Sequence, residues 1–342
     1  MYKKKGITLF LGLLIMILML AACRGTEAPA EAPTPTPMET PVPSGNLPPD
    51  EPTPAPTPEE PPASARPEID REGYAITLPD EINTIVTIGP APTEILVGLG
   101  FADRIISTDR FSADVEGLPA GVAAEFGIMD LDAEYIVNLM PDVIFIAGMA
   151  RGGGDDDPMA PVAVAGITVI YMPTSTSIAE IKDDIRFIAA VMEVPDVGES
   201  LISVMEAEID AIAQIAASIT ETRTVYFEIS PAPWTVSFGA GTFLNEMIEL
   251  VGATNIFADY DGWISVAEEV LLTLNPDVIL TSTGFLEDPI AEIAERPGFD
   301  VITAVLNGDM FQIDENSSSR PTHNITRALR EIAEAVFPEY FG

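Results

Sequence analysis

The sequence predicts an α/β fold: two Rossmann-like lobes with central parallel sheets, joined by one long helix, with a ligand cleft between the lobes. From about residue 68, short β-branched runs alternate with helical patterns, which is typical of parallel strands connected by helices. A segment at 134–144 returns in similar form at 269–279, and a stretch with few helix breakers, 198–219, lies between the two copies. Two facing lobes form a cleft, the usual place for a small-molecule site.

Residues 1–22 predict an export signal. Lysines at 3–5 precede an apolar run at 6–20 that is too short and wrongly flanked for a membrane span. Leu20-Ala21-Ala22-Cys23 then resembles the bacterial lipobox, which implies cleavage before Cys23 and diacylglycerol on its sulfur. We therefore expect an extracytoplasmic lipoprotein anchored to the cell membrane, with an uncleaved N-terminal anchor as the alternative. Cys23 is the only cysteine, so no internal disulfide can form.

Residues 23–67 predict a lipidated cysteine followed by a disordered tether. Proline recurs in runs such as 33–37 and 52–56 without apolar periodicity. Proline removes backbone donors and favours extended polyproline II, so this segment cannot build a core. At ~3.1 Å per residue the tether reaches on the order of 100 Å.

The chain is strongly acidic, with a formal net charge of −38 at pH 7. Loss of the export signal would leave Lys182 as the only lysine. Such a chain repels nucleic acid and anionic headgroups, so we expect neither as a ligand, and membrane contact only through the lipid. The charge by itself indicates a solvated surface and not an acidic binding site.

The first predicted lobe spans 68–197. A strand at 82–88 runs into Gly89-Pro90-Ala91-Pro92 and a helix at 93–99, with proline before the helix and Gly100 after it. Two further strands are expected at 143–147 and 169–172. Ser177-Ile178-Ala179-Glu180 is a capping box that opens a helix ending near Met192.

A long helix at 198–219 is expected to join the lobes, and the second lobe spans 220–342. There the scheme begins again, with a strand at 224–229 and then Gly239-Ala240-Gly241 before a helix at 242–251. The glycine segment is not a phosphate-binding loop, because the lysine of such loops is missing.

The repeated segment carries the prediction of two lobes. Both copies read glutamate, a helical stretch, Leu-x-Pro-Asp and then Val-Ile: Glu134 begins the first copy and Glu269 the second. Proline ends the helix, and aspartate suits the turn into a buried strand.

Over residues 68–342 the sequence resembles the helical-backbone class of ABC substrate-binding proteins, whose members bind cobalamin, ferric siderophores or haem. The resemblance rests on Pro92 to Gly100, on the repeated segment, on 308–313 and on Arg320-Pro321. It implies one rigid helix between the lobes and small closure on ligand. It also implies that Glu134 and Glu269 meet arginines on the two subunits of an ABC permease with its ATPase subunits. The alternative is that each glutamate only stabilises a helix start through the helix dipole.

The ligand site is expected at the carboxyl ends of the strands. Both tryptophans of the chain lie in predicted loops, where they could stack on a flat conjugated ligand or simply cover the core. Arginines could pair with carboxylates of the ligand. The candidate residues are Pro90, Ala91, Pro92, Gly148, Met149, Arg151 and Tyr171 in the first lobe, and Trp234, Phe238, Trp263 and Arg320 in the second.

Two further features allow metal binding. His323, the only histidine, could be an axial ligand to haem iron, although a polar residue is ordinary at the start of a last helix. Asp155-Asp156-Asp157 follow three glycines and could hold calcium, although such a run is more often a flexible loop tip. We expect neither a bound metal ion nor a resident cofactor.

We therefore expect a monomeric substrate-binding lipoprotein that captures an iron-siderophore or a cobalamin-type metal chelate for an ABC importer. A haem-binding component, or a surface adhesion or sensory lipoprotein on the same fold, is the alternative. An enzyme is not expected, because one histidine and no free cysteine leave no Ser-His-Asp or Cys-His set.

Overall fold

A computed structural model describes residues 66–128, 130–151 and 157–342. The expected export signal, Cys23 and nearly all of the expected tether lie outside these ranges, as do Asp155 and Asp156. Within them, no helix is both long enough and apolar enough to cross a membrane.

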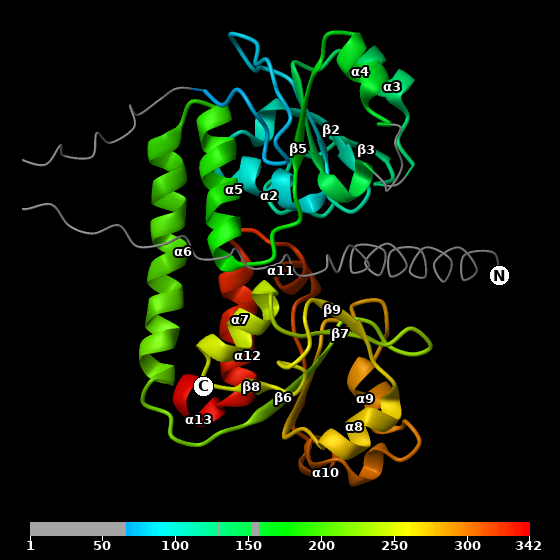
Figure 1. The fold of residues 1–342 in the computed structure, drawn as a ribbon, viewed down its shortest axis with the longest axis vertical. Coiled ribbons are helices and arrows are strands. Elements are labelled where there is room, and N and C mark those ends of the chain that lie inside the picture. Colours follow the sequence, from blue (N-terminus) through cyan, green and yellow to red (C-terminus); the bar gives the residue numbers. More distant parts are fainter. Residues whose placement is uncertain (1–65, 129, 152–156) are drawn as a thin grey trace, which may run out of the picture.

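A parallel sheet with the spatial order β3-β2-β1-β4-β5 forms the centre of the first lobe (Figure 1). Strands β1 and β4 are buried almost throughout because helices cover both faces. The strand order reverses between β1 and β4, and ligands of such sheets bind beyond the carboxyl ends at this point. The strands are β1 (Ile85–Ile88), β2 (Ile105–Asp109), β3 (Ala123–Phe126), β4 (Val143–Ala147) and β5 (Thr168–Met172).

The helices of the first lobe are α2 (Pro90–Gly98), α3 (Ala133–Leu139), α4 (Ala160–Val164) and α5 (Ile178–Val191). Helix α2 begins three residues before the expected start, because proline is well suited to the first helical position. The Ser177 hydroxyl caps α5 by accepting the Glu180 N–H, as a capping box predicts. The Glu180 carboxylate accepts from the N–H of Thr176, one residue earlier than expected.

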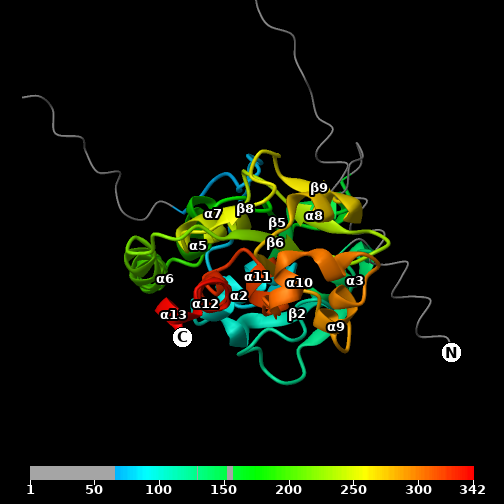
Figure 2. The same cartoon turned by 90° about the horizontal axis from the view of Figure 1, so that it is seen from below.

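Helix α6 (Pro195–Ala216) packs against α5 and continues down the edge of the molecule to the second lobe (Figures 1 and 2). The sequence predicted a helix at 198–219. The helix begins three residues earlier because Pro195 occupies its first turn, where no backbone donor is needed. It also ends three residues earlier than predicted, at Ala216.

The second lobe is built on a smaller parallel sheet with the order β11-β10-β6-β8. Its strands are β6 (Thr224–Glu228), β8 (Thr254–Asn255), β10 (Val278–Thr281) and β11 (Met310–Gln312), and an antiparallel pair, β7 (Val236–Phe238) and β9 (Trp263–Ser265), lies beside it. Its helices are α7 (Phe243–Leu250), α8 (Glu268–Leu274), α9 (Pro289–Ala294), α10 (Thr303–Asn307), α11 (Glu315–Ser319), α12 (Ile325–Val336) and α13 (Pro338–Phe341).

One apolar core extends through both lobes. It joins the inner faces of the two sheets, for example Phe145 of β4 and Phe227 of β6, through residues of α5, α6, α7 and α12. Separate apolar clusters lie under α3 and α4 in the first lobe and under α8 and α10 in the second. The lobes are therefore halves of one packed body.

Candidate functional site

The loop after β1 is held in one conformation by close packing and hydrogen bonds. Gly89 has a φ of 114°, and a Cβ on it would lie 2.7 Å from the Cβ of Ala147, so only glycine fits. Its N–H donates to Oδ2 of buried Asp109 at 2.7 Å. Of the predicted site residues that follow, Pro90 and Ala91 are partly exposed and Pro92 is buried.

The other predicted residues of the first lobe follow β4 or lie in β5. Gly148 and Met149 are partly exposed after β4. Arg151 ends the short helical turn there, and its side chain lies outside the described structure. Tyr171 is buried: its hydroxyl bonds to Asp157, and its ring meets Tyr74 edge to face at 6.1 Å.

The predicted aromatic residues of the second lobe differ strongly in exposure. Trp234 is 55 % exposed in the loop between β6 and β7, and Trp263 is partly exposed in β9. Phe238 is fully buried, with its ring 6.1 Å from that of Trp263 and 5.5 Å from that of Phe227. Phe238 therefore supports Trp263 from within the core.

The structure adds three exposed aromatic side chains that the sequence analysis missed. Phe111, Tyr260 and Phe285 are 45 %, 56 % and 48 % exposed, and each follows the carboxyl end of a parallel strand, as Trp234 does. An aromatic residue in the loop that follows a predicted strand is the signal that could have found them. They place apolar rings from both lobes at the strand ends.

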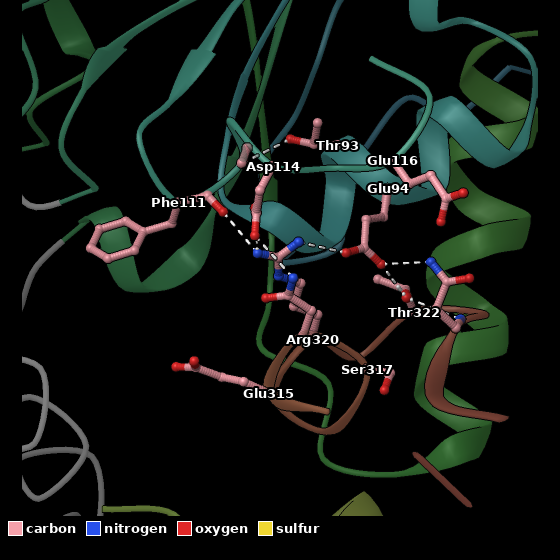
Figure 3. A network of polar contacts seen from close by, with 12 residues as sticks. Thr93, Glu94, Phe111, Asp114, Glu116, Glu315, Ser317, Arg320 and Thr322 are labelled. Atoms are coloured by element: carbon pink, nitrogen blue, oxygen red, sulfur yellow. Dashed lines mark hydrogen bonds and ion pairs between the residues drawn. The ribbon is translucent and has the colours of Figure 1, made fainter. Parts of the chain in front are cut away.

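A buried polar network joins the lobes beside Phe111 (Figure 3). Glu94 of α2 accepts from Arg320 Nη1 at 2.9 Å, from the Thr322 hydroxyl at 2.8 Å and from the Asn324 amide at 2.9 Å. Nη2 of Arg320 also donates to the Phe111 carbonyl at 3.0 Å and to Asp114 at 2.7 Å. Arg320, a predicted ligand residue, is thus bonded to two carboxylates of the first lobe.

The electrostatics of this network follow from burial and pairing. Burial opposes the charge of Arg320, but hydrogen bonds from its guanidinium to Glu94 and Asp114 outweigh that effect and raise its pKa. Burial acts to raise the pKa of Asp114, yet hydrogen bonds from Arg320 and Asn316 lower it on balance. The arginine therefore stays charged, and its charge is compensated within the protein.

Glu315 lies beside the network, at the start of α11. Its carboxylate accepts from the N–H of Gly284, just before Phe285, and in Figure 3 it points to the same side as the Phe111 ring. Burial raises the pKa of Glu315, while the charge of Arg320 partly opposes this shift. Because Asn316 bonds to Asp114, the segment from Glu315 to Arg320 connects the loop carrying Phe111 with the loop carrying Phe285.

His323 belongs to the same boundary between the lobes. A Cβ on Gly98 of α2 would lie 2.6 Å from its Cε1, and its Nδ1 is buried without a hydrogen-bond partner among the described residues. Burial lowers the pKa of His323, with Glu94 opposing the shift. In the described structure this histidine packs on a helix of the other lobe.

The two predicted docking glutamates occupy equivalent positions. Glu134 and Glu269 are exposed second residues of α3 and α8, helices of seven residues each. Each helix ends in a left-handed residue, Met140 or Asn275, and leads into a central strand, β4 or β10.

The aspartate of each Leu-x-Pro-Asp repeat bonds the neighbouring strand start. Asp142 Oδ2 accepts from the N–H of Thr84 at 2.8 Å and from its hydroxyl at 3.0 Å. Asp277 Oδ2 does the same with Thr224, at 2.8 and 2.7 Å. The repeat therefore encodes one junction of helix and two strands in each lobe.

A buried ion cluster supports the start of α8. Arg296 bonds Glu228 with two nitrogens, at 2.6 and 2.8 Å, and also pairs with Glu292 and, at 3.6 Å, with Glu268. Burial raises the pKa of Glu228, and the hydrogen bonds from Arg296 oppose the shift. The cluster fixes the residue that precedes Glu269.

In the described residues, no three His, Cys, Asp or Glu side chains are grouped so that they could hold a metal ion. Asp157, the one described residue of the predicted calcium loop, accepts the N–H of Met159 at 2.8 Å.

Comparison with known proteins matches this architecture to one family. The family model described as periplasmic binding protein matches residues 85–317. The ABC transporter substrate-binding lipoprotein YvrC of Bacillus subtilis is 27 % identical over 277 residues, which is 80 % of this chain and 85 % of the relative. A cobalamin-binding protein of Halobacterium salinarum is 24 % identical, over 86 % of this chain and 80 % of its own length. The solved structure of a possible iron-binding periplasmic protein of Staphylococcus epidermidis is 26 % identical with a TM-score of 0.67, covering 75 % of this chain and all of that one.

Proposed function

The chain belongs to the periplasmic binding protein family, in the helical-backbone class of ABC substrate-binding proteins, and from this premise we propose that it captures a metal chelate for an ABC importer. The family consists of solute-binding proteins that work outside the cytoplasm. That this chain catalyses no reaction stays a prediction.

The exposed aromatic rings at the strand ends carry the proposal. Phe111 from one lobe and Trp234, Tyr260 and Phe285 from the other expose apolar faces where such folds bind ligand. Exposed rings cost free energy in water unless a ligand covers them, and a flat or apolar chelate surface would do so. The names of the relatives, one cobalamin-binding and one possibly iron-binding, agree with this ligand class.

The charges around these rings favour an uncharged or cationic chelate. Arg320 is compensated by Glu94 and Asp114, so it offers no net positive charge to a ligand. Glu315 and the acidic residues beside Tyr260, Asp259 and Asp261, add negative charge. A corrinoid or a ferric hydroxamate therefore suits the site better than haem, whose propionates are anionic, or a ferric tris-catecholate.

Docking to the permease would use Glu134 and Glu269. The two carboxylates are exposed and occupy equivalent positions in the two lobes, which suits two equivalent permease subunits. Charge pairs at an interface set registry and association rate more than affinity. Cys23, once lipidated, would hold the receptor at the membrane through the tether.

A titration tests the proposed ligand class. The mature chain carrying Cys23→Ala would be titrated with cyanocobalamin, ferrioxamine B, ferric enterobactin and hemin, with tryptophan quenching and visible spectra as readouts. We expect micromolar or tighter binding of one of the first two, and weaker binding of the two anionic chelates. Binding of no member would refute capture of a metal chelate, and preference for the anionic members would refute the charge argument alone.

A further inference from the structure

The outer face of α3 and α4, at the tip of the first lobe, is hollowed. One hollow of about 580 Å³ is lined mainly by Val137, Met140, Ala165 and Ile167. A second, of about 280 Å³, shares Val137 and is bordered by Glu134. Because the hollows share this residue, they form one groove, here called the tip groove, with an apolar end and an acidic end.

Large apolar side chains are strongly exposed at and beside the apolar end of the tip groove. Met140 is 77 % exposed, and Val164, next to Ala165, is 88 % exposed. Large apolar side chains with such exposure gain nothing from folding, and clustered ones mark interaction surfaces.

Met140 is also unfavourable for its backbone. Its φ of 48° is left-handed, a conformation that costs a side chain with an ordinary Cβ about 1 kcal/mol. The equivalent residue of the second lobe, with a φ of 47°, is Asn275, a type that tolerates this conformation. Neither burial nor local geometry explains a methionine at 140.

The acidic end of the groove defines the partner's chemistry. Glu134 borders the hollow, and Asp130 and Asp132 are exposed at the same end of α3. A complementary partner surface therefore carries a basic residue and an apolar residue, separated by about the length of α3.

We propose that the tip groove receives an apolar side chain of the permease subunit whose basic residue meets Glu134, so that apolar burial supplies affinity that the charge pair lacks. The inference rests on the proposed function, because the partner is the permease of an ABC importer. It adds an apolar contact at Met140 and Ala165 to the charge pair of Glu134.

Binding is measured to the importer of the source organism, which is first identified by a cross-link from the second lobe. The full lipidated chain with benzoylphenylalanine at Val270, beside Glu269, would be cross-linked in cells, and the permease–ATPase complex so identified would be purified in nanodiscs. If no permease subunit cross-links, the docking function fails together with this inference.

Binding of the lipidated chain to that complex would then be measured for Met140→Asn, Ala165→Arg and a control, Val204→Asn, at a 61 % exposed position of α6. Asparagine suits the left-handed position, so M140N should unfold at the same temperature as wild type or higher. We expect M140N and A165R to weaken binding by about ten-fold or more, and V204N to leave it unchanged.

The outcomes separate the two ideas. Loss of binding in Glu134→Arg with wild-type binding in M140N and A165R would overturn the groove and keep the docking glutamate. Self-association of the wild-type chain that M140N abolishes would assign the groove to a second copy and would also overturn it.

Discussion

Single residues at the lobe boundary combine an exposed side chain with contacts that join the lobes. Phe111 places its ring on the exposed side while its carbonyl holds Arg320, so one residue both offers an apolar face and joins the lobes. His323 packs so closely on Gly98 that no side chain fits there.

We expect Phe111→Ala and Phe285→Ala each to weaken chelate binding about five- to ten-fold, because each removes a ring worth about 1 kcal/mol in stacking alone. Isothermal titration with the chelate that binds wild type would measure this. Tyr340→Ala is the matched control, since Tyr340 is 40 % exposed on α13. Wild-type affinity in both phenylalanine variants would remove these rings from the site.

His323 should make stability depend on pH. Burial lowers its pKa from the ordinary value of 6.5, so the unfolded chain takes up a proton at higher pH than the folded chain. The stability from neutral His323 is therefore complete above about pH 6.5 and is lost as pH falls through the lower folded-state pKa.

Thermal unfolding of wild type and His323→Gln between about pH 5 and about pH 8 would test this. The slope of unfolding temperature against pH should be more positive for wild type than for the variant. The carboxyls whose pKa burial raises, Asp184, Glu228 and Glu315, act in the opposite sense and are common to both proteins. Equal slopes would show that His323 titrates alike in both states.

At the scale of elements, the sequence was most informative where a local pattern fixes local geometry. The repeated Leu-x-Pro-Asp segment located a helix, a turn and a central strand in each lobe, and the capping box located the start of α5. The starts of α2 and α6 lie three residues before the predicted ones, because Pro90 and Pro195 each belong to the first turn of the helix.

Sequence patterns could not supply the pairing of residues that are distant in the chain. Glu94 and Arg320 are 226 residues apart, and nothing local in either segment indicates the other. That Phe111 and Phe285 lie at the same lobe boundary likewise becomes visible only in the folded chain.

Asp142→Asn and Asp277→Asn should destabilise the chain by similar amounts, about 1–3 kcal/mol each, because each weakens charge-assisted bonds to a strand start. Urea unfolding measures both. Asp300→Asn, at an exposed position, should change little. If the two repeat variants differed several-fold in effect, the junctions would not be energetically equivalent.

At the scale of the whole molecule, the apolar core that includes α6 and the buried network around Glu94 both join the lobes. The network is the polar part of this joint, and a buried charge left without its partner is costly.

Arg320→Met should therefore cost about 3–5 kcal/mol of unfolding free energy, and adding Glu94→Gln should recover part of it. A double-mutant cycle in urea measures the coupling. Arg327→Met is the control: its ion pair with Glu116 also crosses the boundary, at 3.6 Å, but both side chains are mostly exposed. Additive effects of the Glu94 and Arg320 changes would show that the pair is not coupled.

The continuous interior that unites the two halves fixes the span between Glu134 and Glu269 at the moment of folding. If the two glutamates dock as proposed, a permease whose two basic residues are spaced differently would pair with one glutamate and not with the other. The spacing of the two carboxylates would then select the permease, independently of their charge.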